Sequence, residues 1–233
     1  AEHADFTARV QALSPDDLPG RVRSSAPDLL HGFHAFKSGV PGLNLHERLG
    51  LPLITTLTGT DINVDLADPG KRRIMLEVLQ RSAAVTVFQE ECLARLVRLG
   101  IPRDRIHTIH QSVAFPVQER FDVRATIGVS RRTAVVLMLG GIRRVKRTAY
   151  AVGALNRVRR RLGDLRLIIA GPILEPKAGA ALQEVLRAHP WVHLLGEVPR
   201  SRIRSLLDQC DVLLNTSVSE SESNAVLEAL SRG

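Results

Sequence analysis

Two carboxylates near the C-terminal end of the chain have the type and spacing to bind a sugar nucleotide. Glu220 and Glu228 enclose seven residues, which pass from a small polar loop into an apolar helical turn at Asn224. The loop follows the apolar run 211–215, which has the length of a buried strand. A loop between a strand and a helix directs backbone N–H groups and the positive helix end toward an anion, while side-chain donors such as Ser223 and Asn224 converge there. The segment predicts a nucleotide diphosphate-sugar site. The alternative is that Glu220 and Glu228 are simply two solvated carboxylates, one in a loop and one on a helix face.

A glycine pair with two basic residues forms the second candidate segment. Gly140 and Gly141 follow the apolar run 133–139 and precede Arg143 and Lys146. Paired glycines let the backbone approach a ligand closely, and the two cations could neutralise a diphosphate. The alternative is an ordinary strand-to-helix turn with solvated basic side chains.

A third segment could hold a flat nucleobase. Gly196 and the backbone of Val198 follow another short apolar run and could form a slot for the base. In isolation, an ordinary turn explains these residues equally well.

The first half of the chain offers residues for the opposite wall of a cleft. The loop after one predicted strand contains Thr58, Gly59 and Asp61. An earlier predicted strand ends near His34, and His31 lies three residues before it. The two histidines lack a third convergent ligand, so a metal site is not predicted, but one of them could contact a substrate. The acidic run that starts at Asp61 fails as a calcium loop, because its sixth and twelfth positions are not Gly and Glu.

Short β-branched runs alternate with amphipathic stretches along the whole chain, which predicts an α/β fold with parallel sheets. The expected strands are 28–33, 53–57, 84–88, 105–109, 133–139, 165–170, 191–195 and 211–215. The expected helices are 4–13, 43–49, 71–82, 90–99, 145–161, 176–188, 200–209 and 224–231.

Periodicity fades over residues 110–132, which indicates a connection between two doubly wound, Rossmann-like domains that face a cleft. We place the domains at 1–115 and 116–233. The chain starts without Met and stops just after a helix, so we expect a fragment in which both domains are truncated.

Composition narrows the class of partner. The net charge is +8, but only 4 of the 32 basic residues are lysine and aromatic residues are 3% of the chain, so a nucleic-acid surface is not expected. No apolar run is long enough to span a bilayer, no signal-peptide pattern occurs, and the two cysteines are isolated. We predict a cytoplasmic protein, with peripheral contact to anionic lipids on the inner membrane face left open.

Taken together, these segments resemble the retaining GT-B glycosyltransferases of family 4, the Glu-x7-Glu group. The pattern is most similar to the glycosyltransferase 1 domain-containing type. The segments that carry the resemblance are Leu57–Asp61, Ala84–Gln89, Gln111–Val113, Gly140–Lys146, Leu195–Val198 and Asn215–Gly233.

The resemblance implies transfer of a sugar from a UDP- or GDP-sugar to an unidentified acceptor, with retained configuration and without a metal or other cofactor. It implies that Glu228 accepts the ribose hydroxyls and that Glu220 holds the donor sugar. Lys146 would stabilise the leaving diphosphate, with Arg143 as its partner. Backbone donors of Ser223, Asn224 and Ala225 would hold the β-phosphate.

Two departures from the family pattern affect these expectations. Thr58 stands where many members have His, which changes the acceptor-side contacts. Ser221 and Glu222 replace a Gly and an apolar residue, and Glu222 would lower donor affinity if it pointed into the site. A non-hydrolysing sugar-nucleotide epimerase and a non-enzymatic basic binding module remain as alternatives.

Overall fold

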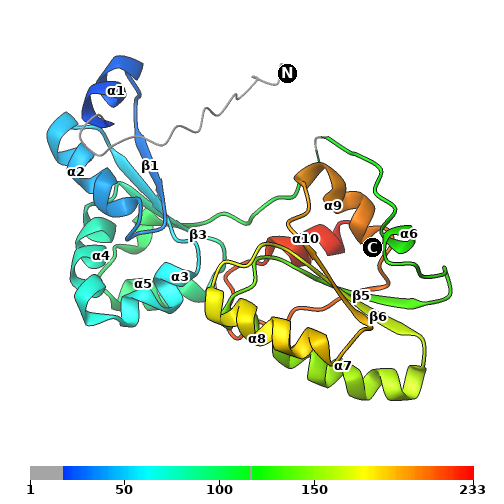
Figure 1. The fold of residues 1–233 in the computed structure, drawn as a ribbon. Helices are drawn as coiled ribbons and strands as arrows, with labels where there is room; N and C mark the ends of the chain where they lie inside the picture. The colour runs from blue at the N-terminus through cyan, green and yellow to red at the C-terminus, as the bar shows by residue number, and fades with distance from the viewer. Residues whose placement is uncertain (1–17, 116) are drawn as a thin grey trace. The chain divides into compact units, whose positions relative to one another are not determined.

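The computed structural model describes residues 18–115 and 117–233 (Figure 1). The chain divides into two compact units, and the second is His110–Gly233. The first unit ends at Ile109. The helix expected at 4–13 lies outside the described residues. Each unit is an α/β structure around its own parallel sheet.

In the first unit, four parallel strands follow one another across the sheet in chain order. They are β1 (Leu30–Phe33), β2 (Leu53–Thr56), β3 (Ala84–Val87) and β4 (Ile106–Thr108). The helical elements are α1 (Leu18–Ser25), α2 (Gly39–Leu49), α3 (Thr60–Asn63), the 3₁₀ turn η1 (Asp65–Ala67), α4 (Pro69–Arg81), α5 (Glu91–Arg98) and the 3₁₀ turn η2 (Arg103–Arg105). Their buried apolar residues form two cores against the sheet, one that includes Met75, Leu79, Val85 and Leu96 and a second formed by Leu43, Leu53 and Val78.

Local signals explain the helix ends in this unit. Asp68 begins α4 by accepting a hydrogen bond from Gly70 N at 2.9 Å, and Pro69 takes the first helical position. Gly50 ends α2 with a left-handed backbone, φ +71°.

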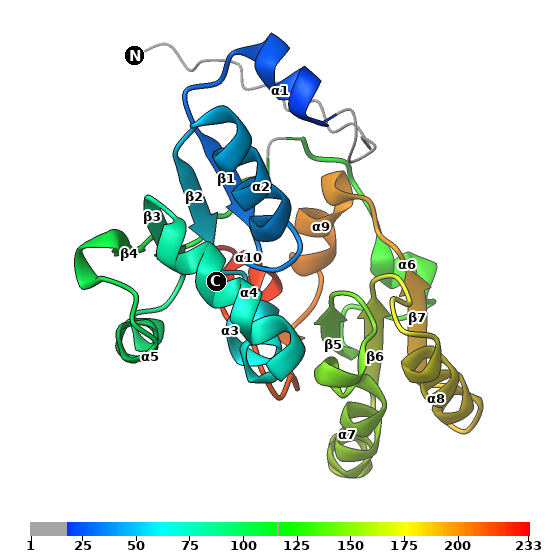
Figure 2. The ribbon, with the colours of Figure 1, turned by 90° about the vertical axis from the view of Figure 1, so that its left-hand side faces the viewer.

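In the second unit, the four strands are parallel and lie in the order β7-β6-β5-β8. Figure 2 shows β5, β6 and β7 side by side. The strands are β5 (Ala134–Leu139), β6 (Leu165–Ala170), β7 (Val192–Gly196) and β8 (Val212–Leu213). The helical elements are α6 (Val123–Thr126), the 3₁₀ turn η3 (Arg144–Lys146), α7 (Thr148–Leu162), α8 (Pro176–Arg187), α9 (Arg200–Leu207) and α10 (Asn224–Leu230). The chain builds β5 to β7 in one direction and then returns to place β8 beside β5. The carboxyl ends of β5 and β8 therefore form a topological switch point, where open α/β sheets bind ligands.

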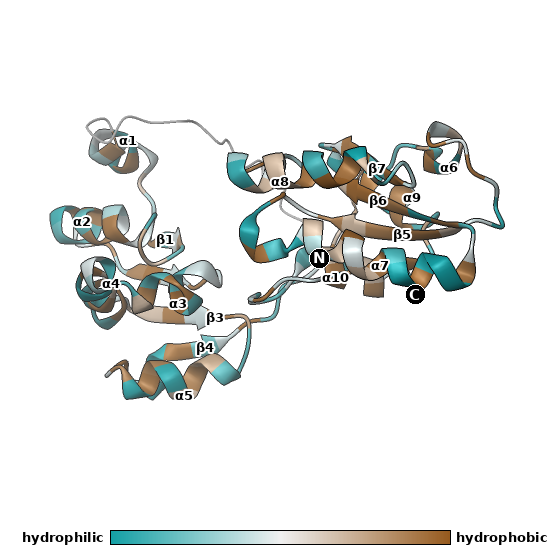
Figure 3. Ribbon diagram, turned by 60° about the horizontal axis from the view of Figure 1, so that its bottom comes forward, coloured by the Kyte–Doolittle hydropathy of each residue, from teal (hydrophilic) through white to brown (hydrophobic). Residues whose placement is uncertain are grey.

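Helices cover both faces of this second sheet. Ala151 and Val152 of α7 and Leu182 of α8 pack on one face. Ile203 and Leu206 of α9 pack on the other. Figure 3 shows the apolar residues gathered on β5 and β6, with hydrophilic residues along α7. The predicted α/β fold with parallel sheets is confirmed.

Two boundaries in the second unit differ from the predictions in ways that affect function. The helix expected from Val145 begins at Thr148, because Arg147 has a left-handed backbone, φ +51°, and residues 144–146 form a 3₁₀ turn. Lys146 consequently lies in a loop and not on a helix. The strand expected at 211–215 has only two residues, Val212 and Leu213, which pair with β5 alone at the sheet edge.

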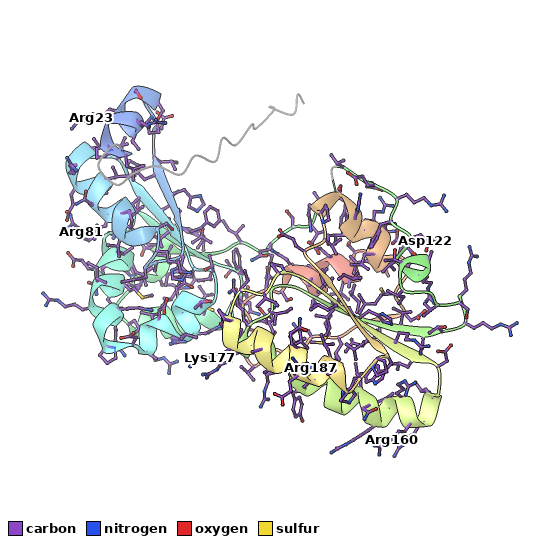
Figure 4. All side chains as sticks on the ribbon, viewed as in Figure 1. Arg23, Arg81, Asp122, Arg160, Lys177 and Arg187 are labelled. Atoms are coloured by element: carbon purple, nitrogen blue, oxygen red, sulfur yellow. The ribbon has the colours of Figure 1, made fainter. Side chains whose placement is uncertain are left out.

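Exposed basic residues occur on helices of both units. Figure 4 labels Arg23 on α1, Arg81 on α4, Arg160 on α7, and Lys177 and Arg187 on α8, all exposed.

Candidate functional site

The candidate site is built from the two loops that leave β5 and β8 at the switch point. The β5 loop carries Lys146 and the β8 loop carries Glu220. The loops are hydrogen-bonded to each other, since Thr216 Oγ1 donates to Lys146 O at 2.7 Å and Val218 N donates to Val145 O at 3.0 Å. These bonds fix the backbone positions of the two segments that the sequence singled out independently.

Lys146 and Glu220 form an ion pair in which Lys146 Nζ donates to Glu220 Oε1. The two side chains are only 25% and 28% exposed, so the pair is shielded but can be reached by a ligand. Burial raises the pKa of the Glu220 carboxyl, but the hydrogen bond and charge of Lys146, together with hydrogen bonds from Ser217 and Asn215, outweigh it and hold that pKa below its usual value. The carboxylate is therefore ionised at neutral pH.

A narrow cavity joins several of the predicted donor-site residues. Gly140, Lys146, Ser223 and Ala225 all line it. Its remaining lining residues are Met138, Leu139, Thr148, Ile169, Leu213, Leu214 and Asn215. The structure thus brings the glycine turn, the lysine and the start of α10 around one small space.

Glycines with positive φ close the carboxyl ends of three neighbouring strands. They are Gly140 (φ +134°), Gly171 (φ +144°) and Gly196 (φ +69°). Gly140 N donates to Ala170 O at 2.8 Å, and Gly171 N donates to Gly196 O at 2.7 Å. A Cβ on Gly171 would overlap the carbonyl oxygen of Gly140. This crowding leaves glycine as the residue that lets the turns after β5 and β6 pack together.

We expect Gly171→Ala to lower the free energy of unfolding by about 3 kcal/mol, because the substitution combines an unfavourable backbone angle with a clash against backbone. Chemical denaturation measures the loss. Gly153→Ala is the matched control: Gly153 lies in α7, and no described atom outside the helix backbone lies within 4 Å of its added Cβ. The control should be neutral or stabilising by up to about 1 kcal/mol. Equal effects of the two substitutions would contradict the assignment.

Glu228 is buried, with 5% of its surface exposed, and it pairs with a residue that the sequence did not identify. Arg200 Nη1 donates to Glu228 Oε1, and Arg200 Nη2 donates to Ala114 O at 2.9 Å. The pairing was missed because Arg200 is one of many arginines on helix surfaces. Only the packing of α9 against α10 distinguishes it.

Glu222 does not pair with Lys146. Its carboxylate accepts a hydrogen bond from Gln111 N at 2.7 Å and contacts His110 Nδ1 at 2.9 Å. Burial raises the pKa of the Glu222 carboxyl. The hydrogen bonds from Gln111 N and His110 and the charge of His110 lower it by more, so the pKa lies below its usual value. The extra carboxylate that seemed to disturb a donor site holds the segment that begins the second unit.

The other predicted donor-side residues occupy different environments. Arg143 is exposed, and its backbone carbonyl accepts a hydrogen bond from Lys146 N at 3.1 Å, while its side chain makes no hydrogen bond or ion pair with any described residue. Asn224 is exposed at the start of α10, whereas Val198 packs against the core beside α9. A Cβ on Gly141 would meet the side chain of Leu174 and not a backbone group.

In the first unit, Asp61 joins the loops that follow β1 and β2. Its carboxylate is fully buried and accepts hydrogen bonds from the backbone N–H groups of Ala35, Thr58, Gly59 and Ile62 at 2.9–3.1 Å. The structure therefore brings the predicted acceptor-side residues together but gives Asp61 the task of holding the backbone. Sequence reasoning placed this side chain on a cleft wall, because a loop aspartate looks the same whether solvent or amides surround it.

His34 lies beside Asp61 in a strained backbone conformation, φ +84°, and is almost fully buried. Its Nδ1 accepts hydrogen bonds from Phe36 N and Lys37 N, each at 3.2 Å, and its Nε2 lies 3.4 Å from Asp65 Oδ2. Lys71 Nζ binds the other oxygen of Asp65 at 2.7 Å. Asp65 and Lys71 were not predicted. Their spacing in the sequence is also typical of the start of an ordinary helix, so it did not indicate this ion pair.

Within residues 18–115 and 117–233, no three His, Cys, Asp or Glu side chains converge as metal ligands would. In the same ranges, no helix has the length and apolar content needed to cross a bilayer.

Each half of the chain matches a known protein family. Residues 2–111 match the family model described as "Glycosyl transferase 4-like domain", and residues 133–233 match "Glycosyl transferases group 1". Both halves of the chain match glycosyltransferase domains.

The relatives that this chain resembles are distant and longer. Glycosyltransferase 1 domain-containing protein 1 of Xenopus tropicalis is 27% identical over 188 residues, 77% of this chain and 54% of the relative. N-acetyl-alpha-D-glucosaminyl L-malate synthase of Bacillus anthracis is 25% identical over 211 residues, 88% of this chain and 55% of the relative. The chain thus spans about half the length of these relatives.

Solved structures share the fold of this chain. HepE of Anabaena, in complex with UDP and glucose, matches with a TM-score of 0.77 and 18% identity over 92% of this chain and 60% of HepE. Sucrose-phosphate synthase of Thermosynechococcus elongatus matches with a TM-score of 0.75 and 16% identity over 94% of this chain and 57% of the synthase. At these identities the likeness concerns the GT-B fold alone.

Proposed function

We propose that the protein transfers a sugar from a nucleotide diphosphate-sugar to an acceptor, with retention of configuration at the anomeric carbon. The observation that carries the proposal is the ion pair of Lys146 with Glu220 at the switch point, beside the cavity lined by Gly140, Ser223 and Ala225. The matches to glycosyltransferase domains support it.

Lys146 supplies the charge that the leaving group needs. Departure of a nucleoside diphosphate develops negative charge on its phosphate oxygens, and a fixed cation lowers the barrier most when it is partly shielded from water. An ammonium group has three N–H donors, so one bond to Glu220 leaves others for phosphate oxygens. Arg143 and the backbone N–H groups of Ser223, Asn224 and Ala225 add further donors for the diphosphate.

Glu220 and Glu228 bind different parts of the donor. Glu220, kept ionised by Lys146, accepts hydrogen bonds from hydroxyls of the donor sugar. Glu228 accepts the ribose hydroxyls, and the turn Gly196–Val198 holds the base. In the first unit, Thr58, Gly59 and His34 are the acceptor-side candidates, and Asp61 positions them.

Nucleotide binding provides the first test. We expect UDP or GDP to raise the melting temperature of the second unit, whereas UMP and GMP, which lack the β-phosphate, raise it less. Incubation with the matching nucleotide sugar and an accepted acceptor should yield a product with the donor's anomeric configuration, read by NMR.

Three results would contradict the proposal. One is a melting temperature that neither nucleotide changes. Another is epimerised sugar nucleotide formed without an acceptor. The third is a melting temperature that responds only to heparin with a steep salt dependence, which indicates a basic binding module.

Glu228→Gln provides the second test, because it preserves the size of the side chain and removes its charge. We expect the KM for the donor to rise about 10- to 100-fold, since a charged hydrogen-bond acceptor contributes about 1.5–3 kcal/mol. Initial rates across donor concentrations measure the change. Glu184→Gln, at an exposed position on α8, is the control and should leave KM unchanged.

A further inference from the structure

Arg200 is the residue that fixes the position of the Glu228 carboxylate. Its guanidinium donates from Nη1 to Glu228 Oε1 and from Nη2 to Ala114 O, and it lies over the ring of Phe115 at 5.2 Å. Phe115 is itself packed against the core beside α9. Three different groups therefore hold the guanidinium plane in one orientation.

The carboxylate needs this partner, because the Glu228 side chain is only 7% exposed while that of Arg200 is 51% exposed. A nearly buried carboxylate without a cation or donor is strongly unfavourable. Arg200 engages one oxygen. The other oxygen, Oε2, makes no hydrogen bond to any described residue and is not sealed off from solvent. A diol can therefore bind Oε2 while Arg200 remains in place.

We propose that Arg200 is a positioning residue that orients Glu228 toward the ribose diol and so sets the preference for ribonucleotides over 2′-deoxyribonucleotides. The proposal rests on the function proposed above. The guanidinium is anchored by Ala114 O and the Phe115 ring, so its charged hydrogen bond to Oε1 restricts the rotation of the Glu228 head group. A fixed acceptor separates ligands with and without a hydroxyl better than a mobile one does, because the missing hydrogen bond cannot be replaced.

Arg202, on the same helix, provides a matched comparison. Its Nε donates to Glu119 Oε2 at 3.0 Å, and its guanidinium lies over the ring of Phe121 at 5.8 Å. Arg202 thus makes the same kinds of contact, to a carboxylate and to an aromatic ring. Its carboxylate partner is exposed and belongs to no predicted donor contact.

The test measures the affinity of the purified protein for UDP and 2′-deoxy-UDP by calorimetry, with GDP and 2′-deoxy-GDP in parallel. We expect the wild type to bind the ribonucleotide about 10- to 100-fold more tightly than its 2′-deoxy analogue. Arg200→Ala should reduce this ratio to less than about threefold, mainly by weakening ribonucleotide binding. Arg200→Lys, which keeps the charge without the fork, should restore part of the ratio, and Arg202→Ala should leave it unchanged.

The outcomes separate the two proposals. A wild type that binds none of the four nucleotides overturns the proposed function and, with it, this inference. A wild type that discriminates while Arg200→Ala discriminates equally well overturns the inference alone. Tighter ribonucleotide binding by Arg200→Ala also overturns it, because Arg200 would then compete with the ribose. Thermal unfolding of each variant identifies a loss of fold, in which case Arg200→Lys decides.

Discussion

Replacement of Lys146 by alanine should lower sugar-transfer turnover about 10²- to 10³-fold, the usual effect of removing one group that stabilises charge in a transition state. Lys146 lies in the loop after β5, is fixed by the hydrogen bonds between its own loop and the β8 loop, and is the cation paired with Glu220. Its loss removes the charge that faces the leaving diphosphate. It also removes the largest of the contacts that lower the pKa of Glu220, so this carboxyl should titrate at a higher pH in the variant, although Ser217 and Asn215 still lower its pKa.

Initial rates and nucleotide affinity should be measured together on this variant. Because Lys146 acts on charge that develops during the reaction, kcat should fall more than UDP or GDP affinity. Lys146→Arg should retain more activity than Lys146→Ala, and Lys177→Ala, at an exposed position on α8, should match the wild type. Wild-type turnover in Lys146→Ala would exclude the site described here, whereas loss of turnover in Lys177→Ala would indicate a general effect of charge.

Each predicted strand appears in the structure because a buried parallel strand has a simple requirement. It needs a short run of β-branched and other apolar residues, and runs such as 165–170 meet it wherever they occur. Elements without such a requirement were missed. The helices α3 and α6 have four residues each, too few to show a helical period, and they form because Gly59 and Asp122 end the preceding loops.

The candidate site was predictable to the level of backbone position but not of side-chain partner. Lys146 and Glu220 come from different parts of the chain, yet both follow strands, and parallel strands end at the same edge of a sheet. The partners of Glu222 and Glu228 depend on how the segment before α6 lies against α9 and α10. Hydrophobic periodicity carries no information on that contact. The same holds for Asp61, whose four donors come from two separate stretches of chain, Ala35 and residues 58–62.

Asp61→Asn should lower the free energy of unfolding of the first unit by about 3–5 kcal/mol. The substitution preserves volume but replaces one acceptor oxygen with an NH₂ group that faces backbone N–H donors. Four buried amides, those of Ala35, Thr58, Gly59 and Ile62, then share a single neutral oxygen. Each buried donor left without an acceptor costs about 1–3 kcal/mol, and relaxation recovers part of the total. Asp68→Asn is the matched control, because Asp68 caps α4 at an exposed position where Asn caps equally well, so its effect should stay below about 0.5 kcal/mol.

Amide hydrogen exchange distinguishes this explanation from a loss of charge alone. Peptides that contain residues 33–36 and 57–63 should lose protection in Asp61→Asn while the strands of the second unit keep theirs, because the donors that Asp61 satisfies all lie in the first unit. Nucleotide affinity should be unchanged at temperatures where the first unit remains folded, since every residue assigned to the donor belongs to the second unit. Equal stability of the two aspartate variants would contradict this account. It would mean that the amides around Asp61 find other acceptors, and Asp61 would again become a candidate for contact with the acceptor.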